Sequence, residues 1–206
     1  EIGLGCWAIG SEWGDVSEID ARKVLKTSLD QGVNFFDTAD VYGDGRSEKF
    51  VGELIKSTSE KIYVATKSGR RLNPHTAQGY NIKNIESFID RSLINLGIEC
   101  IDLLQLHCPP SEICPKKETY EMMDEIVKKG KIANYGVSVE KVSEAMDAIQ
   151  FSNLKSIQII FNIFRQKPAE VFFKEAVKKN VAIIVRVPLA SGMLTGKMNK
   201  NIVFPE

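Results

Sequence analysis

The chain has 206 residues, of which 43% are hydrophobic and 26% are charged, a composition typical of a globular protein long enough to bury a substantial core. Lys plus Arg and Asp plus Glu each number 27, so the formal net charge is zero, and no basic run longer than a pair points to a nucleic-acid partner. The longest apolar stretches are strand-sized, too short for a membrane-spanning helix, so we expect small molecules as partners.

Seven short apolar runs recur along the chain, with helical patterns between them. They begin at residues 2, 33, 62, 101, 132, 156 and 181 and read IGLGCW, VNFFDTA, IYVATK, IDLLQLH, IANYGVS, SIQIIFN and VAIIVRVPL. Nearly continuous apolar character predicts strands that are covered on both faces, as in a parallel sheet. The alternation of these strands with helices indicates repeated βα units.

The segments between the strands have the marks of helices. From Asn84 to Leu96, apolar residues recur every three or four positions while polar residues fill the other side, which predicts a helix lying on a sheet. Several helical segments end at a residue able to take the left-handed conformation just before the next strand. These residues are Gly32, Gly97, Gly130 and Asn180.

Such a pattern fits either an open doubly wound sheet or a (β/α)8 TIM barrel that lacks its last unit. Polar residues favour the barrel, because in that fold reactive groups from the C-terminal ends of many strands converge on one mouth. The residues that terminate or follow the apolar runs are Trp7, Asp37, Lys67, His107, Ser138, Asn162 and Arg186. The glycines of GLGCWAIG do not match G-x-G-x-x-G, so we expect no Rossmann site.

Three of these polar groups, together with Tyr42, predict acid–base chemistry if the strand ends converge. Tyr42 has an ordinary pKa of about 10, so it needs a nearby cation to act near neutral pH. Lys67 can be that cation, Asp37 can pair with the lysine, and His107 adds a neutral imidazole. This set suits a general acid for carbonyl reduction, in which a nicotinamide cofactor must supply the hydride.

With these motifs the sequence resembles the aldo-keto reductase family along all of residues 1–206. The family's catalytic tetrad matches Asp37 and Tyr42 of D-x-x-x-x-Y, Lys67 of ATK and His107 of LLQLH. The stretches FDTADVYGDGRSE and GKIANYGVS are also similar to family signatures. The resemblance implies an oxidoreductase that reduces aldehydes or ketones with hydride from NADPH, with Tyr42 as general acid, His107 orienting the carbonyl, and Lys67 with Asp37 lowering the tyrosine's pKa.

The resemblance also implies a cofactor site at the barrel mouth. Its residues are Cys6, Trp7 and Asp37 near the nicotinamide and ribose, Ser138 and Gln158 at the carboxamide, Arg186 covering the nicotinamide, and Leu189, Ser191 and Gly192 in the loop that holds the pyrophosphate. Two positions depart from the family pattern: Val139 replaces the usual Asn after Ser138, and Arg186 replaces a stacked aromatic ring. A guanidinium can also lie flat on a ring.

The chain begins at Glu1 without a Met and ends after the seventh predicted strand. We therefore expect residues 1–206 to be a single barrel domain truncated at both ends, without the family's N-terminal hairpin, last strand and last helix. The 2′-phosphate pocket would lie beyond residue 206, so NADH stays open beside NADPH, and so does the oligomeric state. The alternative is a slow or inactive module of the same fold that binds the cofactor and senses redox state, or an inactive truncated form.

Other residues have more ordinary interpretations. Cys6, Cys100, Cys108 and Cys114 form no C-x-x-C pair, so we expect free thiols in a reducing cytoplasm and no metal site. Trp7 and Trp13 on the first loop can line a pocket or simply be buried. Asp40 is expected to be a turn residue and His75 an exposed loop residue. The pair Arg70 and Arg71 can attract an anionic substrate or only solvate its loop.

Overall fold

The structure, a computed structural model, describes residues 1–11, 14–199 and 202 of the chain. In this part of the chain, seven parallel strands form one sheet in the order β1-β2-β3-β4-β5-β6-β7. The strands are β1 (Leu4–Gly5), β2 (Phe35–Asp37), β3 (Tyr63–Ser68), β4 (Leu103–His107), β5 (Tyr135–Ser138), β6 (Ser156–Ile160) and β7 (Ala182–Arg186). Each of the seven apolar runs forms one of these strands, as predicted, and β3 extends one residue beyond its run to Ser68.

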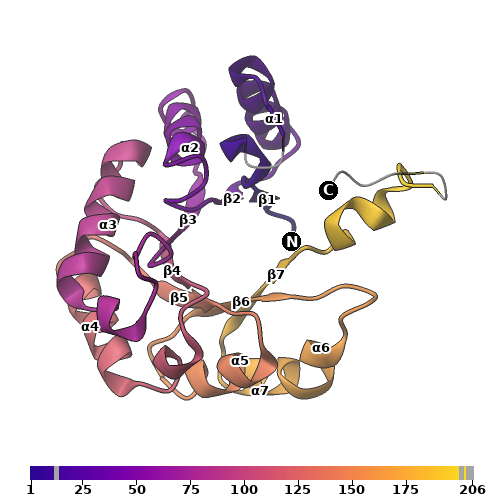
Figure 1. Ribbon diagram of the computed structural model, residues 1–206. Coiled ribbons are helices and arrows are strands. Elements are labelled where there is room, and N and C mark those ends of the chain that lie inside the picture. Colours follow the sequence, from indigo (N-terminus) through magenta and orange to yellow (C-terminus); the bar gives the residue numbers. More distant parts are fainter. Residues whose placement is uncertain (12–13, 200–201, 203–206) are drawn as a thin grey trace.

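Helices connect successive strands and lie on the outside of the ring that the strands form (Figure 1). The α-helices are α1 (Glu18–Asp30), α2 (Arg46–Lys56), α3 (Ile82–Leu96), α4 (Lys117–Lys128), α5 (Val142–Ala148), α6 (Lys167–Val171) and α7 (Phe173–Lys178). Short 3-10 helices are η1 (Ala8–Gly10), η2 (Ala77–Gly79), η3 (Ser111–Ile113) and η4 (Ala190–Thr195). None of the helices in the described residues combines the length and apolar character needed to cross a membrane.

The sheet is curved into a nearly closed barrel rather than open. Asp37 of β2 accepts a hydrogen bond at 3.0 Å from the side chain of Gln158 on β6. These strands are four positions apart in the sheet, and in a flat sheet they would be about 19 Å apart. The contact across the interior therefore decides for the incomplete (β/α)8 barrel, with β1 and β7 as its two edges.

The residues at the ends of the helices determine where the helices begin and end. Helix α3 begins two residues earlier than the predicted Asn84, because the Asn81 side chain accepts a hydrogen bond from the Asn84 main-chain N–H at 3.1 Å and so caps the helix. The four residues expected to be left-handed all have positive φ angles. They are Gly32, Gly97, Gly130 and Asn180.

One hydrophobic core cluster runs between the sheet and the surrounding helices. Phe36 of β2, Leu104 of β4 and Ile157 of β6 are fully buried in it, together with Ile89 of α3 and Met123 of α4. Removing such side chains from water supplies most of the favourable free energy of folding. The helices pack against the outer face of the sheet. The strands are therefore held in fixed positions, and so are the polar residues at their C-terminal ends at the mouth.

Candidate active site

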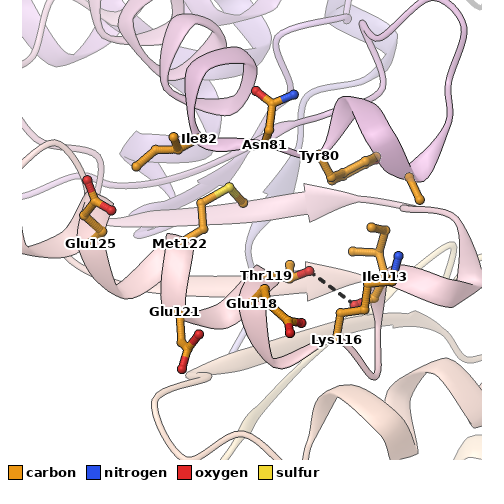
Figure 2. Close-up of a pocket in the computed structure, with 11 residues that line it drawn as sticks. Tyr80, Asn81, Ile82, Ile113, Lys116, Glu118, Thr119, Glu121, Met122 and Glu125 are labelled. Carbon is orange, nitrogen blue, oxygen red and sulfur yellow. Dashed lines mark hydrogen bonds between the residues drawn. The ribbon is translucent and has the colours of Figure 1, made fainter.

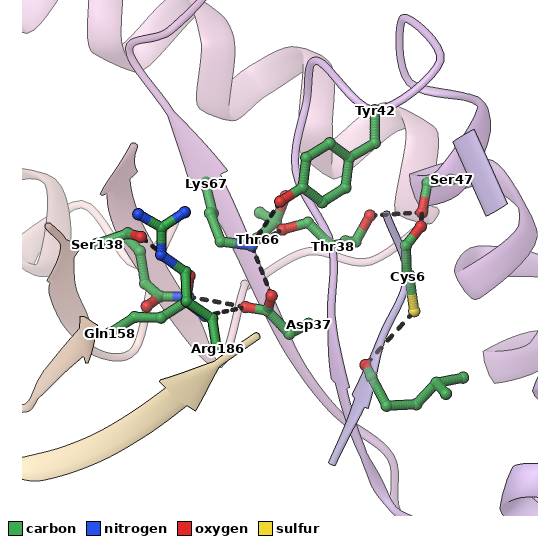
Figure 3. A network of polar contacts seen from close by, with 12 residues as sticks. Cys6, Asp37, Thr38, Tyr42, Ser47, Thr66, Lys67, Ser138, Gln158 and Arg186 are labelled. Atoms are coloured by element: carbon green, nitrogen blue, oxygen red, sulfur yellow. Dashed lines mark hydrogen bonds and ion pairs between the residues drawn. The ribbon is translucent and has the colours of Figure 1, made fainter. Parts of the chain in front are cut away.

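The expected tetrad is brought together at the C-terminal ends of three neighbouring strands, and Figure 3 shows Asp37, Tyr42 and Lys67 of this tetrad. Asp37 ends β2, His107 ends β4, and Lys67 is the penultimate residue of β3. The Lys67 Nζ lies 2.7 Å from Asp37 Oδ2 and donates to the Tyr42 hydroxyl at 3.4 Å. The His107 ring meets the Tyr42 ring edge-on, with 5.8 Å between their centroids. One side-chain cluster therefore contains all four residues.

Tyr42 reaches the cluster from the turn that joins β2 to α2. Gly43 and Gly45 in this turn have φ angles of 58° and 91°, as expected for a tight turn with left-handed residues. The Ser47 hydroxyl, at the start of α2, accepts from Thr38 at 2.8 Å and donates to the Cys6 carbonyl at 2.9 Å. These bonds tie the turn to β1 and fix the place from which Tyr42 returns over Asp37.

Lys67 is fully buried and nevertheless charged. Burial alone would lower the pKa of its ammonium, but the negative charge of Asp37 and contacts with Tyr42 outweigh burial, and the pKa is raised. The Lys67 Nζ also donates to the Thr38 carbonyl at 2.7 Å. A buried charge with its hydrogen bonds made in this way is held in one orientation.

The pKa of Tyr42 differs from the expectation. Burial is the largest effect and raises the pKa of the phenol, while the positive charge of Lys67 acts in the opposite direction without reversing it. The expectation that Lys67 and Asp37 together lower the pKa of Tyr42 is therefore wrong. Lys67 lowers this pKa, but the negative charge of Asp37 raises it, as burial does. The phenol stays protonated at neutral pH, the form that a proton donor requires.

His107 is a neutral imidazole in this environment. Its side chain is only 5% exposed, and burial, followed by the positive charge of Lys67, pulls its pKa well below the ordinary value. Its buried Nδ1 has no hydrogen-bond partner among the described residues. A neutral ring can donate one hydrogen bond to a carbonyl oxygen without bringing a further positive charge to the site.

Gln105 belongs to the cluster but was missed from the sequence. It is fully buried on β4, and its Nε2 donates to Asp37 Oδ1 at 3.0 Å, beside the bond from Gln158. A signal was present, because Gln105 is a polar residue inside the apolar run IDLLQLH and lies two positions before His107, on the same face of the strand. The carboxylate of Asp37 thus accepts from three strands.

Ser138 and Gln158 are directly opposite each other on β5 and β6. The Ser138 hydroxyl donates to Gln158 Oε1 at 2.9 Å. Arg186, at the end of β7, extends over this pair in Figure 3, and its Nη2 donates to the Val139 carbonyl at 3.3 Å and contacts Cys108 Sγ at 3.6 Å. Its buried Nε has no hydrogen-bond partner among the described residues.

Trp7 and Cys6, the two residues expected on the β1 side of the cofactor site, differ in their exposure. Trp7 is 41% exposed, with its ring centroid 6.4 Å from that of Tyr42, so its ring lines the mouth. Cys6 is buried in the core, its thiol donates to the Leu4 carbonyl at 3.6 Å, and burial raises its pKa. The main chain of Cys6 is engaged as well, since its N–H donates to the Asp37 carbonyl at 2.8 Å and its carbonyl accepts from Ser47. Trp13 lies outside the described residues.

The residues expected to hold a pyrophosphate follow β7. Leu189 precedes η4 and is exposed, while Ser191 and Gly192 lie within η4 and have left-handed backbones. The Gly192 N–H donates to the Leu189 carbonyl at 3.0 Å, which closes a turn. Within the described residues, no hydrogen bond or ion pair joins these three residues to the tetrad.

Asp40 is a turn residue, as expected, but it is also fully buried, which the sequence did not indicate. Neither carboxyl oxygen has a hydrogen-bond partner among the described residues. Burial, reinforced by the charge of Glu48, raises the pKa of Asp40 to about 7 against the opposing charges of Arg71 and Arg91. Both arginines donate to the Asp40 carbonyl, at 3.4 and 3.2 Å, rather than to its side chain.

A pocket of about 460 Å³ lies away from this cluster, between the start of α3 and helix α4 (Figure 2). Its wall combines apolar groups such as Ile82 and Met122 with the carboxylates of Glu118, Glu121 and Glu125. None of the tetrad residues lines it. Elsewhere in the described chain, no group of three His, Cys, Asp or Glu side chains is arranged to hold a metal ion. The strand ends at the mouth are therefore the candidate active site.

Comparisons with known proteins identify what the chain is similar to. Residues 1–205 match the model of the aldo/keto reductase family. The chain is 35% identical to the aldo-keto reductase YhdN of Bacillus subtilis, over 98% of this chain and 62% of that protein. It is 31% identical to the Schizosaccharomyces pombe aldo-keto reductase yakc, whose name includes NADP(+), over 100% of this chain and 62% of that protein.

Among solved structures, the glycerol dehydrogenase AKR11B4 from Gluconobacter oxydans superposes with a TM-score of 0.85 at 31% identity. The similarity covers 99% of this chain and 64% of that one. The chain thus spans less than two thirds of the length of each of these relatives.

Proposed function

The chain belongs to the aldo/keto reductase family, and we propose that its protein reduces an aldehyde or ketone to an alcohol with hydride from NADPH, Tyr42 being the proton donor. One observation carries the proposal. The Tyr42 hydroxyl lies 3.4 Å from the Lys67 ammonium, which is itself paired with Asp37 at 2.7 Å. A phenol held next to a buried cation is suited to an oxygen that becomes negative during the reaction.

The protein's part in the reaction is to move one proton and to stabilise charge. As negative charge develops on the carbonyl oxygen, the Tyr42 hydroxyl donates its proton to that oxygen, and Lys67 stabilises the phenolate that is left. The neutral imidazole of His107 donates a hydrogen bond that orients the same oxygen. Asp37 does not exchange a proton in this scheme; it keeps Lys67 charged and in place.

The residues at the mouth fit a nicotinamide cofactor. Ser138 and Gln158 offer a hydroxyl and an amide suited to a carboxamide, and the buried Nε of Arg186 is a donor without a partner among the described residues. The flat guanidinium of Arg186 can cover an aromatic ring. When bound, the reduced cofactor supplies the hydride. Trp7, Cys6 and the turn of Leu189, Ser191 and Gly192 complete the proposed cofactor site.

A single barrel domain is part of the same proposal. The hydrophobic core cluster takes residues from Cys6, directly after β1, through to Ile183 on β7, without a break between two separate cores. A domain is defined by a hydrophobic core of its own. We therefore propose that residues 1–206 belong to one domain.

Replacing Tyr42 by Phe tests the proposal directly. The variant keeps the ring but lacks the proton, so we expect kcat for NADPH-dependent aldehyde reduction to fall about 10² to 10⁴-fold. The measurement is NADPH oxidation at 340 nm with a panel of aldehydes. Tyr63→Phe is the matched control, because Tyr63 is an exposed tyrosine at the start of β3, at the other end of the barrel. Equal rates for wild type and Tyr42→Phe would remove Tyr42 from the mechanism.

Cofactor binding is measured separately from turnover. The ring of Trp7 lies next to that of Tyr42, so NADPH bound at the mouth should quench the tryptophan fluorescence. Tyr42→Phe should keep this quenching, because the phenol hydroxyl is assigned to the proton and not to the cofactor. Quenching without turnover in wild type would favour a binding module, and no quenching up to millimolar NADPH would contradict the cofactor site.

A further inference from the structure

The carboxylate of Asp37 has different partners on its two oxygens. Its Oδ2 contacts the Lys67 ammonium at 2.7 Å. Its Oδ1 accepts a hydrogen bond from Gln105 Nε2 and another from Gln158 Nε2, each at 3.0 Å. Figure 3 shows the contacts of Asp37 with Lys67 and Gln158. Because the two amides bind the oxygen that does not face the lysine, they fix the direction in which the carboxylate presents Oδ2 to Lys67.

The two amides differ in their other contacts. Gln158 Oε1 accepts from the Ser138 hydroxyl at 2.9 Å, and this pair is the one proposed above for the nicotinamide carboxamide. Gln105 Oε1 is buried and has no hydrogen-bond partner among the described residues. In this part of the chain, the side chain of Gln105 therefore makes one hydrogen bond, which goes to Asp37.

Gln105 lies further from the mouth than the residues proposed to bind the cofactor. It is fully buried on β4, opposite Gly136 of β5. His107 and Ser138, two positions later on these strands, are opposite each other at the strand ends, and Ser138 is opposite Gln158. A ligand at the mouth therefore meets Ser138 and Gln158, while Gln105 lies one layer deeper in the barrel.

A glutamine at this position is costly for folding. Burying an amide oxygen without a hydrogen-bond partner carries a desolvation penalty, and an apolar side chain would avoid it. The neighbours of Gln105 along the strand, Leu104 and Leu106, are apolar and buried. The hydrogen bond to Asp37 is thus the one feature of Gln105 that an apolar side chain could not supply.

We propose that Gln105 is a positioning residue, which holds Asp37 in place while Gln158 is engaged with the cofactor. The inference rests on the proposed reductase function and extends it to a residue outside the tetrad and the cofactor site. When the Gln158 amide binds the carboxamide, Oδ1 of Asp37 keeps the hydrogen bond from Gln105. Asp37 then still orients Lys67, whose ammonium lies 3.4 Å from the Tyr42 hydroxyl.

The kinetic test compares three methionine variants of the whole protein. Gln105→Met removes the amide and keeps an unbranched side chain of similar length, and Gln158→Met does the same in the cofactor site. Leu103→Met is the matched control, because Leu103 is a buried residue of β4 two positions before Gln105, on the same face of the strand.

We expect Gln105→Met to lower kcat for aldehyde reduction about tenfold and to keep KM for NADPH within about twofold, because a hydrogen bond to a charged group is lost without loss of a cofactor contact. Gln158→Met should mainly raise KM for NADPH, and Leu103→Met should leave both constants unchanged. An unchanged kcat in Gln105→Met, or an equal fall in Leu103→Met, would overturn the proposal. So would a rise of KM in Gln105→Met as large as that in Gln158→Met.

NMR of the wild-type protein tests the hydrogen bond without turnover and without a variant that has to fold. The side-chain amide protons of Gln105 and Gln158 should both exchange with solvent at least about tenfold more slowly than those of free glutamine. Saturating NADPH should shift the Gln158 signals and leave the Gln105 protons protected. Loss of this protection, or no effect of NADPH on Gln158, would overturn the positioning role.

The two experiments separate this inference from the proposed function. If wild type reduces no aldehyde, but NADPH shifts the Gln158 signals and the Gln105 protons stay protected, the reductase proposal fails and the hold of Gln105 on Asp37 stands. If aldehydes are reduced and Gln105→Met keeps the wild-type kcat, the reductase function stands and the positioning role is overturned.

Discussion

At the scale of single residues, the ion pair between Lys67 and Asp37 determines the charge at the mouth. A fully buried ammonium is costly unless it is paired, and the 2.7 Å contact to Asp37 supplies that pairing. Because the pair raises the folded-state pKa of Lys67, its contribution to stability is complete below the unfolded pKa of about 10.5 and is lost only as pH rises through the higher folded value. The site therefore keeps its cation over the whole physiological range.

Asp40 is the residue whose protonation should govern stability near neutral pH. Its pKa is raised from 3.8 to about 7 by burial, so between these values the folded state holds a proton that the unfolded state has released. Stability consequently falls as pH rises through this window and levels off above it, by up to about 4 kcal/mol. At high pH the ionised carboxylate of Asp40 therefore destabilises the folded state.

Asp40→Asn should remove this dependence. We expect the variant to be more stable than wild type by about 2 to 4 kcal/mol at pH 8 and by less than half of that at pH 5, because the amide stays neutral at both pH values whereas Asp40 of the unfolded wild type is already ionised at pH 5. Urea unfolding from pH 5 to 8 measures the difference. Asp44→Asn is the control, since Asp44 is an exposed carboxylate of the same turn whose pKa is lowered by Arg71. Parallel stability curves for wild type and Asp40→Asn would contradict the assignment.

At the scale of elements, the strands and helices were largely predictable because each needs only local information. An apolar run of strand length followed by an amphipathic segment predicts a βα unit wherever it occurs. The caps were less predictable. Helix α3 begins at Ile82, two residues before the predicted start at Asn84, because the side-chain hydrogen bond of Asn81 decides where the helix begins.

The turn between β2 and α2 is the element on which Tyr42 depends. Gly43 has a φ of 58°, and a Cβ at this position would overlap the Gly10 carbonyl oxygen of η1. Gly43→Ala should therefore displace the turn, lowering stability by about 2 to 3 kcal/mol and lowering kcat as Tyr42 moves. Thermal unfolding and aldehyde reduction measure the two effects.

Gly130→Ala separates backbone strain from displacement of the turn. Gly130 has a φ of 76°, but a Cβ there would meet no atom within 4 Å. We expect this variant to lose about 1 kcal/mol of stability and to keep its kcat. Similar losses of kcat in both variants would show that the close approach to Gly10 does not position Tyr42.

For the whole molecule, the tetrad could be predicted because parallel barrel strands all carry their reactive groups at the same end. The properties that depend on three-dimensional packing could not. The net rise of the Tyr42 pKa, the burial of the Cys6 thiol and the carboxylate–amide contacts of Asp37 arise from residues far apart in the chain. Gln105 is recognisable in the sequence as a polar residue in an apolar strand. Its hydrogen-bond partner on β2, Asp37, is known only from the folded structure.

The two edges of the sheet should make the chain of residues 1–206 prone to self-association. On the edge strand β7, Val185 is 39% exposed, and unpaired strand edges with apolar side chains pair readily with other chains. Val185→Lys should reduce the high-mass species seen by light scattering or sedimentation. Val24→Lys, a change at an exposed valine of helix α1, should not. Equal reduction by both variants would point to net charge and not to the edge.

The hydrogen bonds of Asp37 inside the barrel also become possible one after another during synthesis of the chain. The bonds to Gln105 and Gln158 span 68 and 121 residues of chain, whereas the ion pair with Lys67 spans only 30. As the chain leaves the ribosome, Asp37 can meet its lysine early, but it gains its second amide only after residue 158 has been synthesised. Until then the carboxylate lacks one of its two amide donors, so the hydrogen bonds of the candidate site are complete only once the chain as far as β6 has been made.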